Sequence, residues 1–327
     1  MALSALAFTS PAFRPSQLHS SFPVKNGAHP IGFSTALRLP GRSLSAAPRM
    51  TSLRAMTNPE TGLRGLLDLL QASPPTWESS LLNNLLIFLV GSPILVTGLS
   101  VPGIVSAFLL GTLTWRGFGP AGFLLVATYF VIGTAVTKLK IAQKEALGVA
   151  EKRKGRRGPG SVIGSSAAGC VCAFCAIYGI AGPASFGLWQ LGFVASFCTK
   201  LSDTVSSEVG KAFGKTTYLV TTFKIVPRGT EGAVSVEGTV AGLLASVLLA
   251  GVACLMGQVS APEAVLCVLA SQIANLGESI LGASLQEKEG FRWLNNDVVN
   301  VINITIGSIL AVLMQQFVLR SLLSLNI

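Results

Sequence analysis

The sequence predicts an all-α polytopic membrane protein, built as a bundle of six to eight transmembrane helices. Half of its 327 residues are hydrophobic and only 12% are charged, and the mean hydropathy is +0.62. Several apolar runs approach the roughly 20 residues that a helix needs to cross a bilayer. Because these runs lack the polar face that a surface helix turns to water, a large soluble domain is excluded.

Eight apolar runs are candidate membrane spans, and glycines and prolines at their edges leave the boundaries open by a few residues. The runs are 82–98, 101–117, 120–137, 162–182, 185–199, 236–257, 262–283 and 298–320. The second and fifth runs are short. We expect the membrane domain over 82–327, preceded at 57–81 by a linker or an interfacial helix.

The N-terminal segment has the composition of an organelle transit peptide. Residues Met1–Pro59 contain no Asp or Glu, while six Lys and Arg residues are scattered among many Ser, Thr, Ala and Pro residues. The Met-Ala start and the Ser-rich character favour a plastid over a mitochondrion. We therefore predict a plastid transit peptide over 1–56 of a multi-pass chloroplast membrane protein, with the envelope favoured over the thylakoid. The alternative is a disordered tail that stays attached.

Without this leader the chain loses most of its positive charge and all of its histidines. Six of the 24 basic residues and no acidic residue lie in the leader, so the formal charge falls from +10 to +4. That argues against nucleic acid as a partner. Because His19 and His29 also lie there, serine-histidine, cysteine-histidine and histidine-metal chemistries are excluded.

The basic loop between the third and fourth runs predicts how the chain is oriented. Segment 138–161 holds eight Lys and Arg residues against two Glu residues, which marks the stromal side by the positive-inside rule. Its basic residues set topology and contact anionic lipids; the alternative is that they attract nucleotide or lipid phosphate.

Counting spans from that loop predicts that the acidic residues converge. Two spans lead to the polar segment 200–235, and two more lead to 284–297, so all three are expected as stromal loops. This requires that the short run 185–199 crosses the membrane. The acids that would then share one face are Asp203, Glu208, Glu231, Glu237, Glu278 and Asp297.

Segment 200–235 carries most of the predicted site, because ionisable groups near hydrocarbon are costly and usually functional. One helix face would carry Asp203, Ser207, Gly210 and Gly214. A second would carry Glu208, Lys211 and Lys215. The alternatives are helix packing for the small residues and a plain Glu208–Lys211 ion pair. The run that begins at Gly210 narrowly misses a P-loop, because Val209 stands where the first glycine is needed.

The second part of this segment, Lys224–Gly232, has the pattern of a rigid basic loop. Pro227 fixes one backbone dihedral and the glycines allow left-handed ones. Arg228 is suited to bidentate contact with a phosphate. Glu231 would hold a magnesium ion or pair with Arg228, and the pattern leaves both open.

These motifs resemble a known enzyme family. The pattern D-T-x-S-S-E-x-G-K-x-F-G-K from Asp203, K-x-x-x-R-G-T-E-G from Lys224 and G-T-x-A-G from Gly238 is similar to plastid phytyl-phosphate kinases of the vitamin E pathway. These belong to the integral-membrane isoprenyl-phosphate kinases, and the resemblance covers about 82–327. More loosely, the same block resembles the CTP-dependent membrane kinases of phytol and dolichol.

The resemblance implies a phosphotransferase that moves a phosphoryl group from a nucleoside triphosphate, with CTP favoured, to phytyl monophosphate. The product, phytyl diphosphate, would serve tocopherol synthesis. The absence of histidine fits this reaction, since a phosphate monoester has a second pKa of about 6 and needs no general base. The alternatives are a prenol or other lipid kinase, a cytidylyltransferase, and an ion-coupled transporter.

We assign the residues by their chemistry. Asp203 and Glu208 would bind Mg²⁺, Lys211 and Lys215 the donor phosphates, and Lys224 and Arg228 the acceptor phosphate. The remaining predicted site residues are Ser207, Gly210, Gly214, Thr230, Glu231, Gly232 and Arg157.

Overall fold

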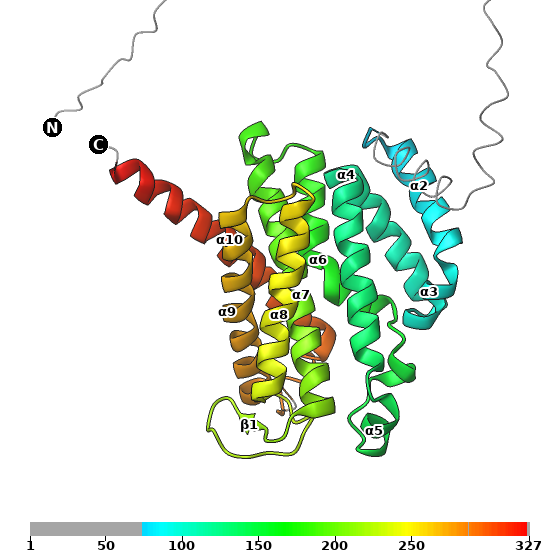
Figure 1. Ribbon diagram of the computed structural model, residues 1–327, viewed down its shortest axis with the longest axis vertical. Helices are drawn as coiled ribbons and strands as arrows, with labels where there is room; N and C mark the ends of the chain where they lie inside the picture. Colours follow the sequence, from blue (N-terminus) through cyan, green and yellow to red (C-terminus); the bar gives the residue numbers. More distant parts are fainter. Residues whose placement is uncertain (1–73, 287, 326–327) are drawn as a thin grey trace, which may run out of the picture. The chain divides into compact units, whose positions relative to one another are not determined.

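The computed structural model describes residues 74–286 and 288–325, which form a helical bundle with one short two-stranded sheet (Figure 1). The predicted transit peptide and residues 57–73 lie outside the described residues. The helices are α2 Trp77–Val90, α3 Ser92–Gly98, α4 Val101–Lys138, α5 Ile141–Ala146, α6 Pro159–Ile177, α7 Phe186–Phe213, α8 Val236–Leu255, α9 Ala261–Leu285 and α10 Asn296–Leu325, with 3-10 turns η2 Lys152–Gly155 and η3 Pro183–Ser185. The strands are β1 Tyr218–Leu219 and β2 Ala233–Val234, paired antiparallel.

The described helices confirm the all-α polytopic membrane fold. Five of them, α4, α6, α8, α9 and α10, are long and apolar enough to cross a membrane, and there are six if α2 and α3 form one broken span. The chain bends by 79° between α2 and α3. The single predicted run 82–98 is therefore two helices that meet at Gly91.

Helix α4 is a hairpin that contains two of the predicted spans. At its middle Gly119 has φ +68° and is followed by Pro120, which lacks the N–H that a continuous helix needs. A Cβ on Gly103 would lie 2.4 Å from the carbonyl oxygen of Arg157, and one on Gly133 would lie 2.8 Å from its guanidinium. A straight helix would separate these glycines by about 45 Å. The legs 101–118 and 120–138 therefore fold back on each other.

Helix α7 is the centre of the bundle and packs against α4, α6, α8, α9 and α10. It begins at the short predicted run 185–199 and continues as a helix through the first part of the polar segment. The expectation of a loop from residue 200 is therefore wrong. The loop begins at Gly214, because the charged side chains before it have partners that allow their burial.

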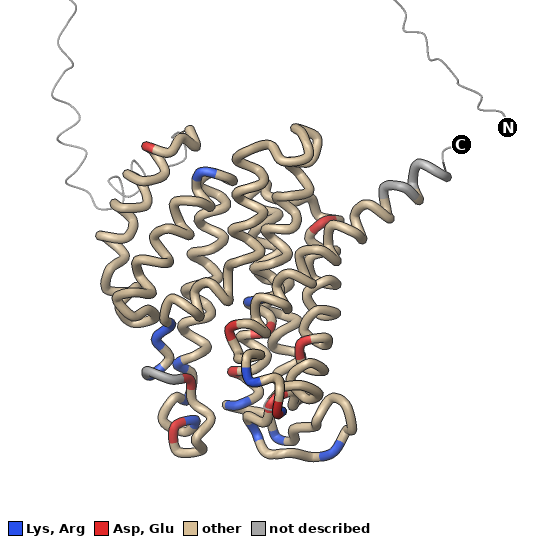
Figure 2. The backbone as a smooth tube through the Cα atoms, turned by 180° about the vertical axis from the view of Figure 1, so that it is seen from behind, with Lys and Arg blue, Asp and Glu red and all other residues tan. Residues whose placement is uncertain are grey.

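Charged residues gather at one end of the bundle (Figure 2). This charged end is formed by segments 139–158, 214–235 and 288–295, and the β-sheet and α5 lie there in Figure 1. The arrangement follows from the chain direction, because α6 to α10 alternate between leaving and approaching this end. The predicted acids do gather at this end, although α7, which contains most of the run 185–199, is not among the helices long and apolar enough to cross a membrane.

Candidate functional site

The first element of the site is a charged pair on α7. The ammonium of Lys200 lies 2.5 Å from Asp203 Oδ2 and donates a hydrogen bond of 2.7 Å to Asn300 Oδ1 on α10. The Lys200 side chain is 8% exposed and that of Asp203 is 14% exposed. The Lys200 ammonium thus bridges α7 and α10, while the Asp203 side chain remains partly exposed.

The second element is Glu208, which two ammonium groups surround. Lys144 of α5 pairs with its Oε2, and Lys211 lies 3.4 Å from its Oε1. Lys144 also donates a hydrogen bond of 2.7 Å to the carbonyl of Thr137, and Lys211 reaches Glu151 at 3.5 Å. Lys144 is fully buried. Part of the basic loop 138–161 is therefore buried in the protein interior.

The structure does not bring Asp203 and Glu208, the predicted ligands of magnesium, together. Five residues apart on an α-helix, the two side chains point about 140° away from each other. Asp203 pairs with Lys200, which also contacts Asn300 of α10, whereas Glu208 pairs with Lys144 of α5. Within 74–286 and 288–325, no three His, Cys, Asp or Glu residues are grouped to hold a metal ion.

Glu278 of α9 is the acidic neighbour of Asp203. Its carboxylate is within electrostatic reach of Asp203, Lys200 and Glu231. Gly232, at φ +73°, fixes this arrangement, since a Cβ there would lie 2.4 Å from the carbonyl oxygen of Ser279. Counting spans predicts that Glu278 shares one end of the bundle with Asp203, but only the structure shows that the two are within electrostatic reach of each other.

The predicted basic loop lies on the surface of the charged end. Lys224, Thr230 and Glu231 are exposed and Arg228 is partly exposed. The hydroxyl of Thr230 donates a hydrogen bond of 2.8 Å to the carbonyl of Pro227, which rigidifies the turn. This loop can therefore meet a ligand that arrives from water.

Two other predicted residues, Lys215 and Ser207, are also exposed. Lys215 is exposed, and its backbone N–H donates to Glu237 at 3.3 Å. Ser207 is also exposed, and its hydroxyl donates to the carbonyl of Thr204 at 3.1 Å. Their functional groups border solvent at the same end of the bundle.

The predicted substrate-binding glycines Gly210 and Gly214 lie in a packing seam between α7 and α8. A Cβ on Gly214 would lie 3.0 Å from the hydroxyl of Ser235, the N-cap of α8, and one on Gly210 would lie 3.3 Å from it. On α8, a Cβ on Gly238 would lie 2.5 Å from the carbonyl of Ser206. Helix packing, which the sequence leaves open as an alternative, is the role these positions have in the structure.

The middle of the bundle contains an amide network whose members are not among the predicted site residues. Asn275 donates to Ser202 at 2.9 Å, and Asn303 donates to Asn275 at 3.0 Å. Gln272 reaches Ser202 at 3.1 Å. Amides inside apolar runs are the sequence signal for such a network, because a buried amide requires hydrogen-bond partners.

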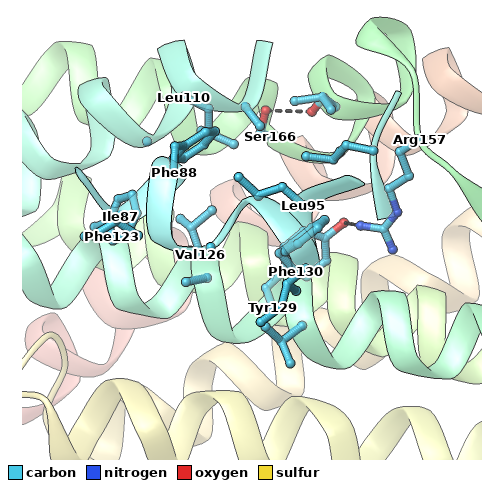
Figure 3. A pocket seen from close by; sticks show the side chains of 18 of the residues that line it. Ile87, Phe88, Leu95, Leu110, Phe123, Val126, Tyr129, Phe130, Arg157 and Ser166 are labelled. Carbon is cyan, nitrogen blue, oxygen red and sulfur yellow. Dashed lines mark hydrogen bonds between the residues drawn. The ribbon is translucent and has the colours of Figure 1, made fainter. Parts of the chain in front are cut away.

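Arg157, a predicted substrate-binding residue, lies at one edge of an apolar pocket (Figure 3). Its guanidinium donates a hydrogen bond of 2.8 Å to the Tyr129 hydroxyl and lies 5.3 Å from the centroid of that ring. The pocket has a volume of about 200 Å³ and is bordered by α2, α3, both legs of α4 and α6. It depends on the bend at Gly91 and on the α4 hairpin, so hydropathy alone does not predict it.

The fold and the charged end define a class, that of helical integral membrane proteins with an ionisable site at one end of the bundle. The chain belongs to the family described as integral membrane protein DUF92, which it matches over residues 84–308. All the site residues described above lie in this range.

The chain is similar to three known proteins. It is 73% identical over 255 residues to protein VTE6, chloroplastic, of Arabidopsis thaliana, covering 78% of this chain and 77% of that protein. It is 49% identical over 207 residues to an uncharacterized membrane protein of Synechocystis (63% and 78% covered). It is 31% identical over 213 residues to another of Methanocaldococcus jannaschii (64% and 83% covered). No solved structure matches the chain at a significant level.

Proposed function

We propose that this protein is a phosphotransferase of the chloroplast membrane that makes phytyl diphosphate for tocopherol synthesis. It would transfer the terminal phosphoryl group of a nucleoside triphosphate, with CTP favoured, to phytyl monophosphate. The observation that carries the proposal is the partly exposed Asp203 side chain, paired with Lys200 and within electrostatic reach of Glu278 at the charged end. The resemblance to phytyl-phosphate kinases and the similarity to a chloroplast protein support it.

For this reaction the protein needs mainly to position the two substrates and to neutralise the charge of their phosphates. The acceptor is a phosphate monoester, whose second pKa of about 6 leaves its oxygen anionic at neutral pH. Its attack on the terminal phosphorus forms the new P–O bond, and the bond to the departing nucleoside diphosphate breaks. Fixed cations stabilise the charge that builds up between the two phosphates.

The position of each cation suggests which substrate it meets. Lys215, Lys224 and Arg228 lie on or beside the solvent-facing loop, so we assign them, with Lys211, to the nucleotide, which arrives from water. This changes the predicted role of Lys224 and Arg228 as contacts of the acceptor. The lipid phosphate is left to cations that border the interior of the bundle.

The residues present also fit a magnesium ion. Mg²⁺ commonly takes one or two protein carboxylates and completes its shell with water and substrate phosphates. Asp203, whose side chain is 14% exposed, and its neighbour Glu278 would hold it. When bound, the ion would neutralise charge on the donor phosphates.

An assay with defined substrates tests the proposal. Proteoliposomes that contain the full chain would receive phytyl phosphate, Mg²⁺ and one of CTP, ATP, GTP or UTP, and products would be identified by mass spectrometry. We expect phytyl diphosphate and a nucleoside diphosphate. Release of pyrophosphate would instead indicate a cytidylyltransferase, and no product with any triphosphate would refute the proposal.

A matched pair of variants tests the role of Asp203. We expect Asp203→Asn to lower turnover by at least about a hundredfold, as for the loss of a group that stabilises transition-state charge. Glu145→Gln, which changes an exposed carboxylate of α5 at the same end, should retain activity. Equal turnover in the two variants would remove Asp203 from the mechanism.

A further inference from the structure

The pocket beside Arg157 is apolar along most of its wall and positively charged at one edge. Figure 3 shows Phe88, Leu95, Leu110, Phe123 and Val126 around it, with Arg157 and Tyr129 to one side. Sites of this kind, with an apolar body and a few placed polar groups, suit amphiphilic small molecules. We call it the Arg157 pocket.

Arg157 has no acidic ion-pair partner in the described part of the chain. Its side chain is half-buried and donates to the neutral hydroxyl of Tyr129, and no Asp or Glu of residues 74–286 and 288–325 forms an ion pair with it. Lys200 is an electrostatic neighbour of the same sign. Because a partly buried cation is costly without an anion, this edge favours an anionic ligand.

The backbone is arranged to make room for the guanidinium. The guanidinium of Arg157 lies against Gly133, where a Cβ would be only 2.8 Å from one of its nitrogens. The main chain of Arg157 is anchored as well, with its N–H donating to Gly98 at 2.8 Å and its carbonyl accepting from Ser100 at 3.0 Å. Arg157 is therefore held at the pocket edge by several contacts.

The pocket also leads toward the proposed catalytic cluster. The ring of Tyr129 packs on that of Phe197 of α7, with centroids 5.5 Å apart. Phe197 stands one helical turn before Lys200, the partner of Asp203. A head group bound at Arg157 would thus lie next to the pair that we place at the phosphoryl transfer.

We propose that the Arg157 pocket binds the acceptor, with the isoprenoid chain along its apolar wall and the phosphate monoester on Arg157. The inference rests on the proposed function, because it takes a prenyl phosphate as the substrate. The planar guanidinium matches two oxygens of a phosphate. A membrane phospholipid would offer two chains and a singly charged diester, so its competition with the prenyl phosphate is an outcome of the test.

Binding in the absence of nucleotide tests this pocket directly. The full chain would be placed in nanodiscs of neutral lipid, and the affinities for phytyl phosphate and for phytol measured. Arg157→Gln should weaken phytyl phosphate by about tenfold or more, the effect of losing a charged hydrogen bond, and leave phytol unchanged. Ala127→Phe, which fills the apolar wall, should weaken both ligands.

Two matched controls separate the pocket from general damage. Arg116→Gln removes an arginine that lies over Trp77, and Ala135→Phe enlarges an exposed alanine on the same leg of α4. Both should leave both affinities unchanged. Equal losses in test and control variants, or phosphatidylglycerol competing as well as phytyl phosphate, would overturn the proposal.

A photolabel makes the test independent of variant folding. A diazirine placed on the chain of phytyl phosphate should label wild-type peptides that contain 87–99 or 123–131, and labelling confined to other helices would overturn the inference. The outcomes also separate the two proposals. Pocket binding without turnover of any triphosphate refutes only the function, whereas turnover with an unaffected KM in Ala127→Phe refutes only the pocket.

Discussion

Replacing Lys144 by methionine tests whether charge pairing ties the basic loop to the centre of the bundle. Lys144 and Glu208 are 0% and 2% exposed, so solvent screens their interaction little. Breaking a buried pair typically costs about 3–5 kcal/mol, because the remaining charge stays buried. In Lys144→Met the Glu208 carboxylate still has Lys211 at 3.4 Å, so we expect the lower end, about 3 kcal/mol.

The reverse change should cost more. Glu208→Met leaves the Lys144 ammonium with only the carbonyl of Thr137 at 2.7 Å, so we expect a loss near 5 kcal/mol. The double variant removes both charges and should be more stable than Glu208→Met alone, since apolar replacements of a whole buried pair are often tolerated. The decisive result is therefore whether the double variant is more stable than Glu208→Met.

The free energy of unfolding would be measured by denaturant titration in detergent micelles, followed by circular dichroism. Lys140→Met is the matched control, because Lys140 is exposed in the same loop and lies over the ring of Phe213 at 3.9 Å. That contact contributes about 1 kcal/mol or less. The reasoning is refuted if Lys144→Met costs no more than Lys140→Met, or if the double variant loses the sum of the single effects.

Three further predictions address the packing seam, the pocket and the metal. Gly238→Ala should destabilise the protein by about 1–3 kcal/mol through overpacking, since its Cβ would lie 2.5 Å from the carbonyl of Ser206. Gly251→Ala on the same helix should not destabilise the protein, because no atom lies within 4 Å of its Cβ. Equal melting temperatures of the two variants would contradict this prediction. Gly133→Ala should displace the Arg157 guanidinium and weaken the binding of phytyl phosphate. Gly277→Ala, whose Cβ would meet no atom within 4 Å, should leave that binding unchanged. Unchanged affinity in both variants would argue against the pocket geometry. Chelating Mg²⁺ with EDTA should abolish turnover and leave phytyl phosphate binding intact, and activity that persists under EDTA would exclude the metal.

The fold class and the face of the site could be predicted from the sequence. Apolar runs of membrane length decide that the chain is a helical membrane protein, because lipid offers no hydrogen bonds to unpaired backbone groups. Each crossing reverses the chain, so counting spans from the basic loop brings Asp203, Glu278 and Asp297 to one end. The motifs of segment 200–235 predict phosphate chemistry by the kinds of residue they contain.

Tertiary structure decided which partner each of these residues meets. Helical spacing predicts a Glu208–Lys211 pair, but the buried partner of Glu208 is Lys144, 64 residues away. Asp203 and Glu208 share one segment and still pair with different lysines, Lys200 and Lys144. From the sequence, Gly210 and Gly214 could equally have bordered a ligand. In the structure the start of α8 packs against them. The Arg157 pocket requires the bend at Gly91 and the hairpin at Gly119. Composition and periodicity determine what is buried in the membrane, whereas pairing and cavities depend on side chains that only the packed helices bring together.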